Sequence, residues 1–155
     1  MKEELLVFGV IELKEPVEYQ KLQKETKPGV EISLEFWVPE EEEEEELETE
    51  YRVKRIKLYA TSTFSELENT ISEVVETIKK YVFLAKRYFF GVRMEFENAE
   101  KTGRFADSLD KEVLMVRLSD SIVDVFVINS MNVNSFVEKV KKGLKECQEV
   151  VRSTK

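Results

Sequence analysis

The chain has 155 residues, a formal net charge of −8, and 42% apolar and 10% aromatic residues. This length and composition predict one folded domain with its own hydrophobic core, and they exclude a wholly disordered chain. The lack of histidine and the single cysteine, Cys147, exclude Ser–His and Cys–His nucleophile pairs, histidine-ligated metal sites and an internal disulfide.

The first segments along the chain predict strands. Residues 5–13 are apolar at almost every position, which is typical of a central strand covered on both faces. Residues 17–24 alternate weakly and predict a further strand. Residues 30–38 alternate clearly between apolar and polar, and Trp37 falls on the polar side of that strand.

A dense run of glutamates follows these strands. Residues 40–46 are all glutamate, and Glu48 and Glu50 extend the run, so residues 39–49 are predicted to form an acidic loop. Like charges at this density repel one another and cannot face a core. The run carries more negative charge than the chain's net −8, so the remainder is close to neutral and contains basic segments.

The next strand is predicted at residues 50–60. Its apolar positions change parity between Val53 and Ile56, which would turn one of the two groups outward in a regular strand. We therefore predict a β-bulge near Lys54 and Arg55, where one extra residue restores the pattern.

A long helix is predicted after this strand. Thr63 and Ser65, each followed three residues later by glutamate, are typical of a helix start. The helix is predicted to continue to about Phe90 and to end at Gly91. Apolar residues recur every three or four positions and predict one buried stripe. The members of the stripe are Leu67, Ile71, Val74, Val75, Ile78, Val82, Ala85 and Phe89.

The second half of the chain predicts strands again and then a last helix. Strands are expected at 92–97, 112–118 and 122–129, with a short fourth near 102–106. Asp124 is a carboxylate inside an otherwise apolar strand. We expect a lysine or arginine partner for it, because an unpaired buried carboxylate is unfavourable.

Strands followed by a helix, occurring twice, give the approximate order ββββα-βββ(β)α. This order predicts a single α+β domain over residues 1–155, with a mostly antiparallel sheet, two main helices and pseudo-halves at 1–90 and 91–155. Whirly-type and PUR-repeat proteins, which bind single strands on their sheets, have the same element order. The likeness is one of element order alone, because the chain carries no motif of either family.

Basic and aromatic side chains gather on the strand at 50–60 and on the last half of the predicted helix. Cations that meet phosphates and rings that stack on bases are typical of sites for single-stranded nucleic acid. Alternatively, the basic groups of the strand pair with Glu31 and Glu35 across the sheet. The candidate nucleic-acid residues are Arg52, Lys54, Arg55, Lys57, Tyr59, Lys79, Lys80, Lys86 and Arg87.

The same helix also predicts a contact surface for another protein chain. Large apolar side chains outside the buried stripe need cover from a second element of this chain or from a second copy. The candidate interface residues are Tyr81, Phe83, Leu84, Tyr88, Phe90 and Trp37.

The first functional hypothesis is a non-enzymatic binding or assembly module that acts through protein–protein contacts, as a homodimer. The alternative is a single-stranded nucleic-acid-binding protein. We expect no catalytic residue, cofactor or metal, because the chain lacks the side chains that most often supply them. No apolar run is long enough to span a membrane and no signal peptide is recognised, so a cytoplasmic location is expected, with a composition like that of heat-adapted proteins.

Overall fold

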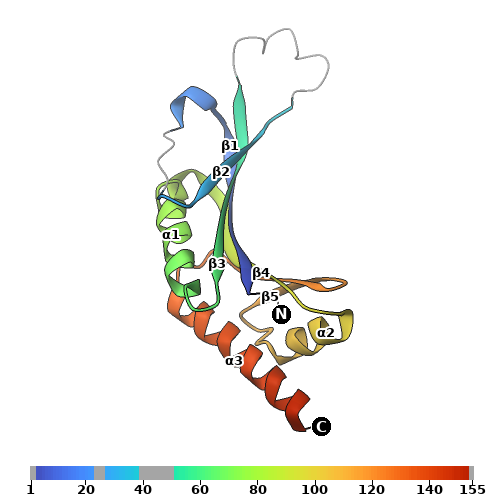
Figure 1. Ribbon diagram of the computed structural model, residues 1–155. Helices are drawn as coiled ribbons and strands as arrows, with labels where there is room; N and C mark the ends of the chain where they lie inside the picture. Colours follow the sequence, from blue (N-terminus) through green and yellow to red (C-terminus); the bar gives the residue numbers. More distant parts are fainter. Residues whose placement is uncertain (1–2, 23–26, 39–50, 154–155) are drawn as a thin grey trace.

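The computed structural model describes residues 3–22, 27–38 and 51–153. Over these residues the chain forms an α+β fold with a six-stranded antiparallel sheet and three α-helices (Figure 1), which confirms the predicted class. The elements in chain order are β1 (Glu4–Glu18), the 3-10 turn η1 (Tyr19–Lys21), β2 (Glu31–Phe36), β3 (Arg52–Thr63), α1 (Leu67–Lys79), the 3-10 turn η3 (Val82–Leu84), β4 (Ala85–Glu95), α2 (Ala99–Ser108), β5 (Met115–Ser119), β6 (Ile122–Ile128) and α3 (Val133–Ser153).

The strand order in the sheet is β2-β3-β1-β4-β6-β5. β4 pairs with β1 on one side and with β6 on the other, so one sheet spans both predicted halves, 1–90 and 91–155. The predicted acidic loop at 39–49 lies outside the described residues. No helix in the described part of the chain is long and apolar enough to cross a membrane.

The helices cover one face of the bent sheet. Figure 1 shows α1 and α3 on the same side of the strands, and the odd-numbered residues 5–13 of β1 are buried there. Gly9 lets α1 come close, because a β-carbon at this position would lie 2.8 Å from Cγ1 of Val74. The Phe90 ring of β4 packs on Phe136 of α3, with the ring centroids 5.1 Å apart. This face therefore carries the core.

The predicted bulge is confirmed in β3. Glu35 pairs with Arg55 and Phe36 pairs with Val53, so Lys54 is the extra residue on the β3 side. The insertion absorbs the parity change seen in the sequence, and apolar residues on both sides of it, Val53 included, are buried.

The long helix predicted from residue 65 to about Phe90 is wrong in its second half. α1 ends at Lys79, and β4 begins at Ala85. The segment after Lys79 is rich in aromatic and β-branched residues, which fit a sheet, and its pairing with β1 and β6 buries Phe90. The first half of the predicted stripe is confirmed and consists of the buried residues Leu67, Ile71, Val74, Val75 and Ile78.

Two short strand predictions are also wrong. Residues 102–106 lie in α2, a third helix, whose first turn is capped by the Asn98 side chain accepting a hydrogen bond from the Lys101 backbone N–H at 2.9 Å. The strand predicted at 17–24 is not separate in its described part, because β1 continues to Glu18 and is followed by η1, and residues 23–24 lie outside the described residues.

Gly91 offers a test of how tightly the sheet is packed. A β-carbon there would collide with the carbonyl oxygen of Val125 and lie 2.6 Å from Cβ of Phe126, so Gly91→Ala is expected to cost about 1–3 kcal/mol of unfolding free energy. Gly103 in α2 has no atom within 4 Å of its built β-carbon. Gly103→Ala is therefore expected to gain up to about 1 kcal/mol from helix propensity. Urea unfolding of both variants measures the difference, and equal stabilities would contradict this packing.

Candidate functional site

The face of the sheet opposite the helices is open and concave. A depression of about 450 Å³ lies on it, built by alternate residues of β1, β3, β4, β5 and β6. Five basic side chains and two carboxylates line it, although the whole chain has a net charge of −8. The lining consists of Leu6, Phe8, Val10, Glu12, Arg55, Lys57, Tyr59, Arg87, Phe89, Arg93, Arg117, Asp124 and Phe126.

Strand register arranges these side chains in rows that cross the sheet. One charged row, here called the Arg87 row, contains Glu35, Arg55, Glu12 and Arg87 from four neighbouring strands. A second charged row, here called the Arg93 row, contains Leu6, Arg93, Asp124 and Arg117. The two rows are three side-chain steps apart along β1, which is about 20 Å at roughly 3.4 Å per residue.

Aromatic side chains fill the space between the two charged rows. Phe8, Gly91 and Phe126 are direct neighbours across three strands. The missing side chain of Gly91 leaves room for the two flanking rings, because a β-carbon there would lie 2.8 Å from Cζ of Phe8. The Phe126 ring centroid lies 6.4 Å from that of Phe8 and 5.4 Å from that of Phe89. Tyr59 extends this floor onto β3.

Two arginines lie over the edges of this aromatic floor. The guanidinium carbon of Arg117 is 5.7 Å from the Phe126 ring centroid, and that of Arg87 is 6.0 Å from the Phe89 centroid. Cations at this distance from a ring face are attracted by its quadrupole. Arg117 forms no ion pair with any residue that the structure describes, so its charge is available to a ligand.

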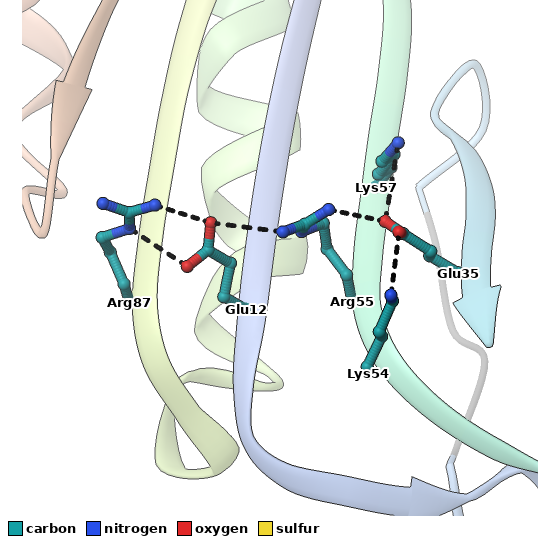
Figure 2. A network of polar contacts seen from close by, with 6 residues as sticks. All are labelled: Glu12, Glu35, Lys54, Arg55, Lys57 and Arg87. Atoms are coloured by element: carbon teal, nitrogen blue, oxygen red, sulfur yellow. Dashed lines mark hydrogen bonds and ion pairs between the residues drawn. The ribbon is translucent and has the colours of Figure 1, made fainter. Parts of the chain in front are cut away.

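Figure 2 shows the Arg87 row as a network of ion pairs on the face opposite α1. The Arg87 guanidinium donates to both oxygens of Glu12, with Nη2–Oε1 at 2.7 Å and Nε–Oε2 at 3.1 Å. Nη2 of Arg55 lies 3.7 Å from the same Oε1, on the other side of the carboxylate. Glu12 is thus held between two guanidinium groups from the neighbouring strands β4 and β3.

Glu35 closes the network on the β2 side. Its carboxylate accepts a 2.7 Å hydrogen bond from Nη1 of Arg55 and has Lys54 and Lys57 at 3.4 and 3.8 Å. The hydrogen bond from Arg55 holds the pKa of Glu35 below its ordinary value. The hydrogen bonds to Glu12 likewise raise the pKa of Arg87. The alternative prediction, that basic groups of β3 pair with Glu31 and Glu35, is therefore confirmed for Glu35, whereas Glu31 forms no ion pair among the described residues.

Asp124 has the basic partner that the sequence predicts. Arg93 donates to both of its carboxylate oxygens, at 2.8 and 3.0 Å, and this contact raises the pKa of Arg93. The Asp124 side chain is 9% exposed, compared with 21% for Glu12 and 33% for Glu35. Asp124 is therefore part of the wall of the depression, while the other two carboxylates reach solvent.

The predicted nucleic-acid residues divide into two groups. Arg55, Lys57, Tyr59 and Arg87 line the depression, and Lys54 contacts Glu35 beside it. The remaining candidates do not line it: Lys79 lies in the last turn of α1, Lys80 follows it, Lys86 lies in β4, and Arg52 lies over the Trp37 ring at 5.9 Å. Lys79, Lys80, Lys86 and Arg87, which the sequence places together on the last half of one helix, do not share a helix, because α1 ends at Lys79 and β4 begins at Ala85.

Among the lining residues that the sequence prediction missed are the aromatic and basic residues Phe8, Phe89, Arg93, Arg117 and Phe126. For Phe8 and Phe126 a signal is present, because both parities of residues 5–13 and 122–129 are apolar. That pattern was interpreted as cover on both faces. The structure instead leaves Phe8 and Phe126 half-buried on the open face.

The predicted interface residues are mostly committed to the fold itself. Tyr81 and Phe90 are buried in the core, and Leu84 and Tyr88 are partly buried against it. Phe83 is 70% exposed. Trp37 is half-buried under Arg52.

A second, more voluminous depression of about 620 Å³ has a different character. Its lining is acidic and hydroxylic, with four glutamates and no basic or aromatic side chain. No group of three or more histidine, cysteine, aspartate or glutamate side chains able to hold a metal ion occurs within the described ranges. The open face of the sheet is therefore the candidate site.

The two bidentate pairs are expected to differ in what they do for stability. Asp124→Asn removes a charge from a nearly buried, doubly hydrogen-bonded pair and is expected to cost about 2 kcal/mol. Glu12→Gln alters a more exposed pair and is expected to cost less. Guanidinium unfolding measures both values. A larger loss for Glu12→Gln would mean that the Arg87 row is structural.

Comparison of the chain with protein-family models, with curated proteins and with solved structures found no match. The open face therefore has to be interpreted from its own side chains.

Proposed function

We propose that this protein binds single-stranded nucleic acid on the open face of its sheet. The observation that carries the proposal is the gathering of five basic and four aromatic side chains in one concave depression of an acidic protein. Basic groups neutralise phosphates, and ring faces stack on bases irrespective of sequence. Both requirements are met within one surface.

The arrangement favours a single strand over a duplex. The rings of Phe8, Phe89 and Phe126 form the floor between the two charged rows, and all three line the depression. In a duplex the faces of the bases are covered by their neighbours, whereas an unpaired base presents its face. The charged rows on either side then contact the phosphates.

The basic groups keep donors for a ligand although several are paired. A guanidinium has five N–H donors, and Arg87 uses two of them on Glu12. Arg93 donates two to Asp124 and remains 49% exposed, and Arg117 has no ion pair within the described residues. The pairs therefore orient the arginines without saturating them.

Binding should depend on salt and on this face. We expect an oligothymidylate of about twenty nucleotides to bind with an affinity that falls steeply with salt, because phosphate binding releases counterions. Lys57→Gln and Arg117→Gln are each expected to weaken binding roughly three- to tenfold and to reduce the slope of log affinity against log salt by about 0.7.

Lys145→Gln is the matched control. Lys145 is an exposed residue of α3, on the helix side of the sheet, and its replacement removes the same charge. Fluorescence anisotropy with the single strand and with its duplex compares all proteins. The proposal is wrong if nothing binds at low salt, if the duplex binds better, or if Lys145→Gln weakens binding as much as Lys57→Gln.

A specific observation also supports a second function, self-association. β5 is an edge strand, and Met115 and Leu118 on it are 47% and 52% exposed. A groove of about 370 Å³, partly lined by Leu114 and Val116, runs along it beside α2. Arg117 is the one charged residue of the strand, which has no lysine, proline or bulge to protect its edge. We infer that a second copy pairs with it antiparallel, about a two-fold axis that leaves both open faces on the same side of a joined sheet.

Leu118→Lys tests this edge. The charge would enter the groove side of the paired strands, so the variant is expected to sediment as a monomer at concentrations where the unaltered protein is a dimer. Phe83→Lys is the control, since Phe83 is 70% exposed and lies in η3, away from β5. A monomeric unaltered protein contradicts the inference, and dissociation by Phe83→Lys alone would place the interface at the sequence-predicted residue instead.

A further inference from the structure

The Glu12 carboxylate lies between two guanidinium groups, which are also the groups that bind phosphate. Arg87 presents two N–H groups to its two oxygens, and Arg55 approaches one of those oxygens from the neighbouring strand on the other side. The planar guanidinium binds carboxylate and phosphate oxygens with the same two-point geometry. The two arginines would therefore hold a phosphodiester in the place that Glu12 now occupies (Figure 2).

The contrast with Asp124 indicates which carboxylate is exchangeable. The Asp124 side chain is 9% exposed and has one arginine partner in the wall of the depression. The Glu12 side chain is 21% exposed, and two arginines approach it. A solvent-reached ion pair contributes little net stability, so a ligand phosphodiester, which also presents two anionic oxygens to a guanidinium, can replace it.

The subsite is also correctly placed for a nucleotide. Glu12 and Arg87 are direct neighbours across β1 and β4, and the next pair on the same face is Val10 and Phe89. This step is about 7 Å along the strand. A phosphate held by Arg87 and Arg55 therefore leaves its base within reach of the Phe89 ring.

We propose that Arg87 and Arg55 form a phosphodiester subsite that Glu12 fills in the free protein, and that a bound single strand displaces the Glu12 carboxylate. The proposal rests on the function proposed above and assigns one phosphate contact within it. Glu12 then acts as a built-in competitor. It orients the two guanidinium groups while no ligand is bound. It also lowers the affinity for a polyanion, because the ligand phosphate has to displace the carboxylate.

Replacing Glu12 should therefore strengthen nucleic-acid binding, whereas replacing an ordinary binding residue weakens it. Glu12→Gln is expected to raise the affinity for the oligothymidylate three- to tenfold. It is also expected to steepen the slope of log affinity against log salt by about 0.7, since no displaced carboxylate then takes up a cation while the bound strand releases its own. Glu12→Ala removes the side-chain acceptor altogether and is expected to give a gain of similar size.

Glu31→Gln is the matched control for the loss of a negative charge. Glu31 is exposed on the same face, opposite Tyr59, and forms no ion pair among the described residues. Its replacement is expected to change the affinity less than twofold and to leave the salt slope unchanged. A gain of equal size in both glutamine variants would mean that only the overall charge matters, which overturns the subsite.

Adding Arg87→Gln to Glu12→Gln should abolish the gain in affinity, because the subsite then lacks its main donor.

Thermal unfolding of every variant shows whether the proteins compared are folded. An oligouridylate of equal length compares RNA with DNA. Weaker binding by both Glu12 variants, with salt-dependent binding by the unaltered protein, overturns the subsite and leaves the proposed function standing. No binding by any protein at low salt overturns the function itself.

Discussion

The three helices pack on only one side of the sheet, and the surface chemistry follows from this one-sided burial. Along β1, the odd-numbered residues 5–13 face α1 and α3 and close the core, so their even-numbered neighbours face solvent. An antiparallel sheet tolerates this arrangement when the exposed face is polar. Here the exposed face carries rings as well, because Phe8, Phe89 and Phe126 shelter one another over Gly91. The open face is therefore partly apolar and concave, which is the form of a binding surface.

On the open face, carboxylates neutralise part of the positive charge of the lysine and arginine side chains beside them. The carboxylates of Glu12, Glu35 and Asp124 form ion pairs with a larger number of lysine and arginine side chains. Asp124 is nearly buried and belongs to the wall, because an uncompensated carboxylate at this depth would be unfavourable. Glu12 and Glu35 reach water, where ion pairs are weak and exchange with other anions. The same kind of contact thus has a structural role at one end of the face and an exchangeable role at the other.

The sequence predicted what depends on local pattern and failed where tertiary pairing decides. The bulge at Lys54, the stripe of α1 and the basic partner of Asp124 follow from parity, helical spacing and the cost of a buried charge. The segment after Lys79 was assigned to a helix because its apolar spacing fits either period. Pairing with β1 and β6, invisible in a local window, makes it β4. That single error separated Arg87 from Arg55 in the prediction, although the structure brings them to the same carboxylate.

The sequence-based preference for protein assembly rested on the aromatic second half of a predicted helix, which the structure ends at Lys79. Once residues 85–95 are β4, the rings and cations of that segment divide between the two faces of the sheet. Phe90 enters the core, while Arg87, Phe89 and Arg93 join the basic strand β3 on the open face. The net charge of −8 does not oppose this, since charges beyond about 8–10 Å are largely screened at physiological salt. A polyanion close to the sheet therefore responds to the local excess of cations rather than to the charge of the whole chain.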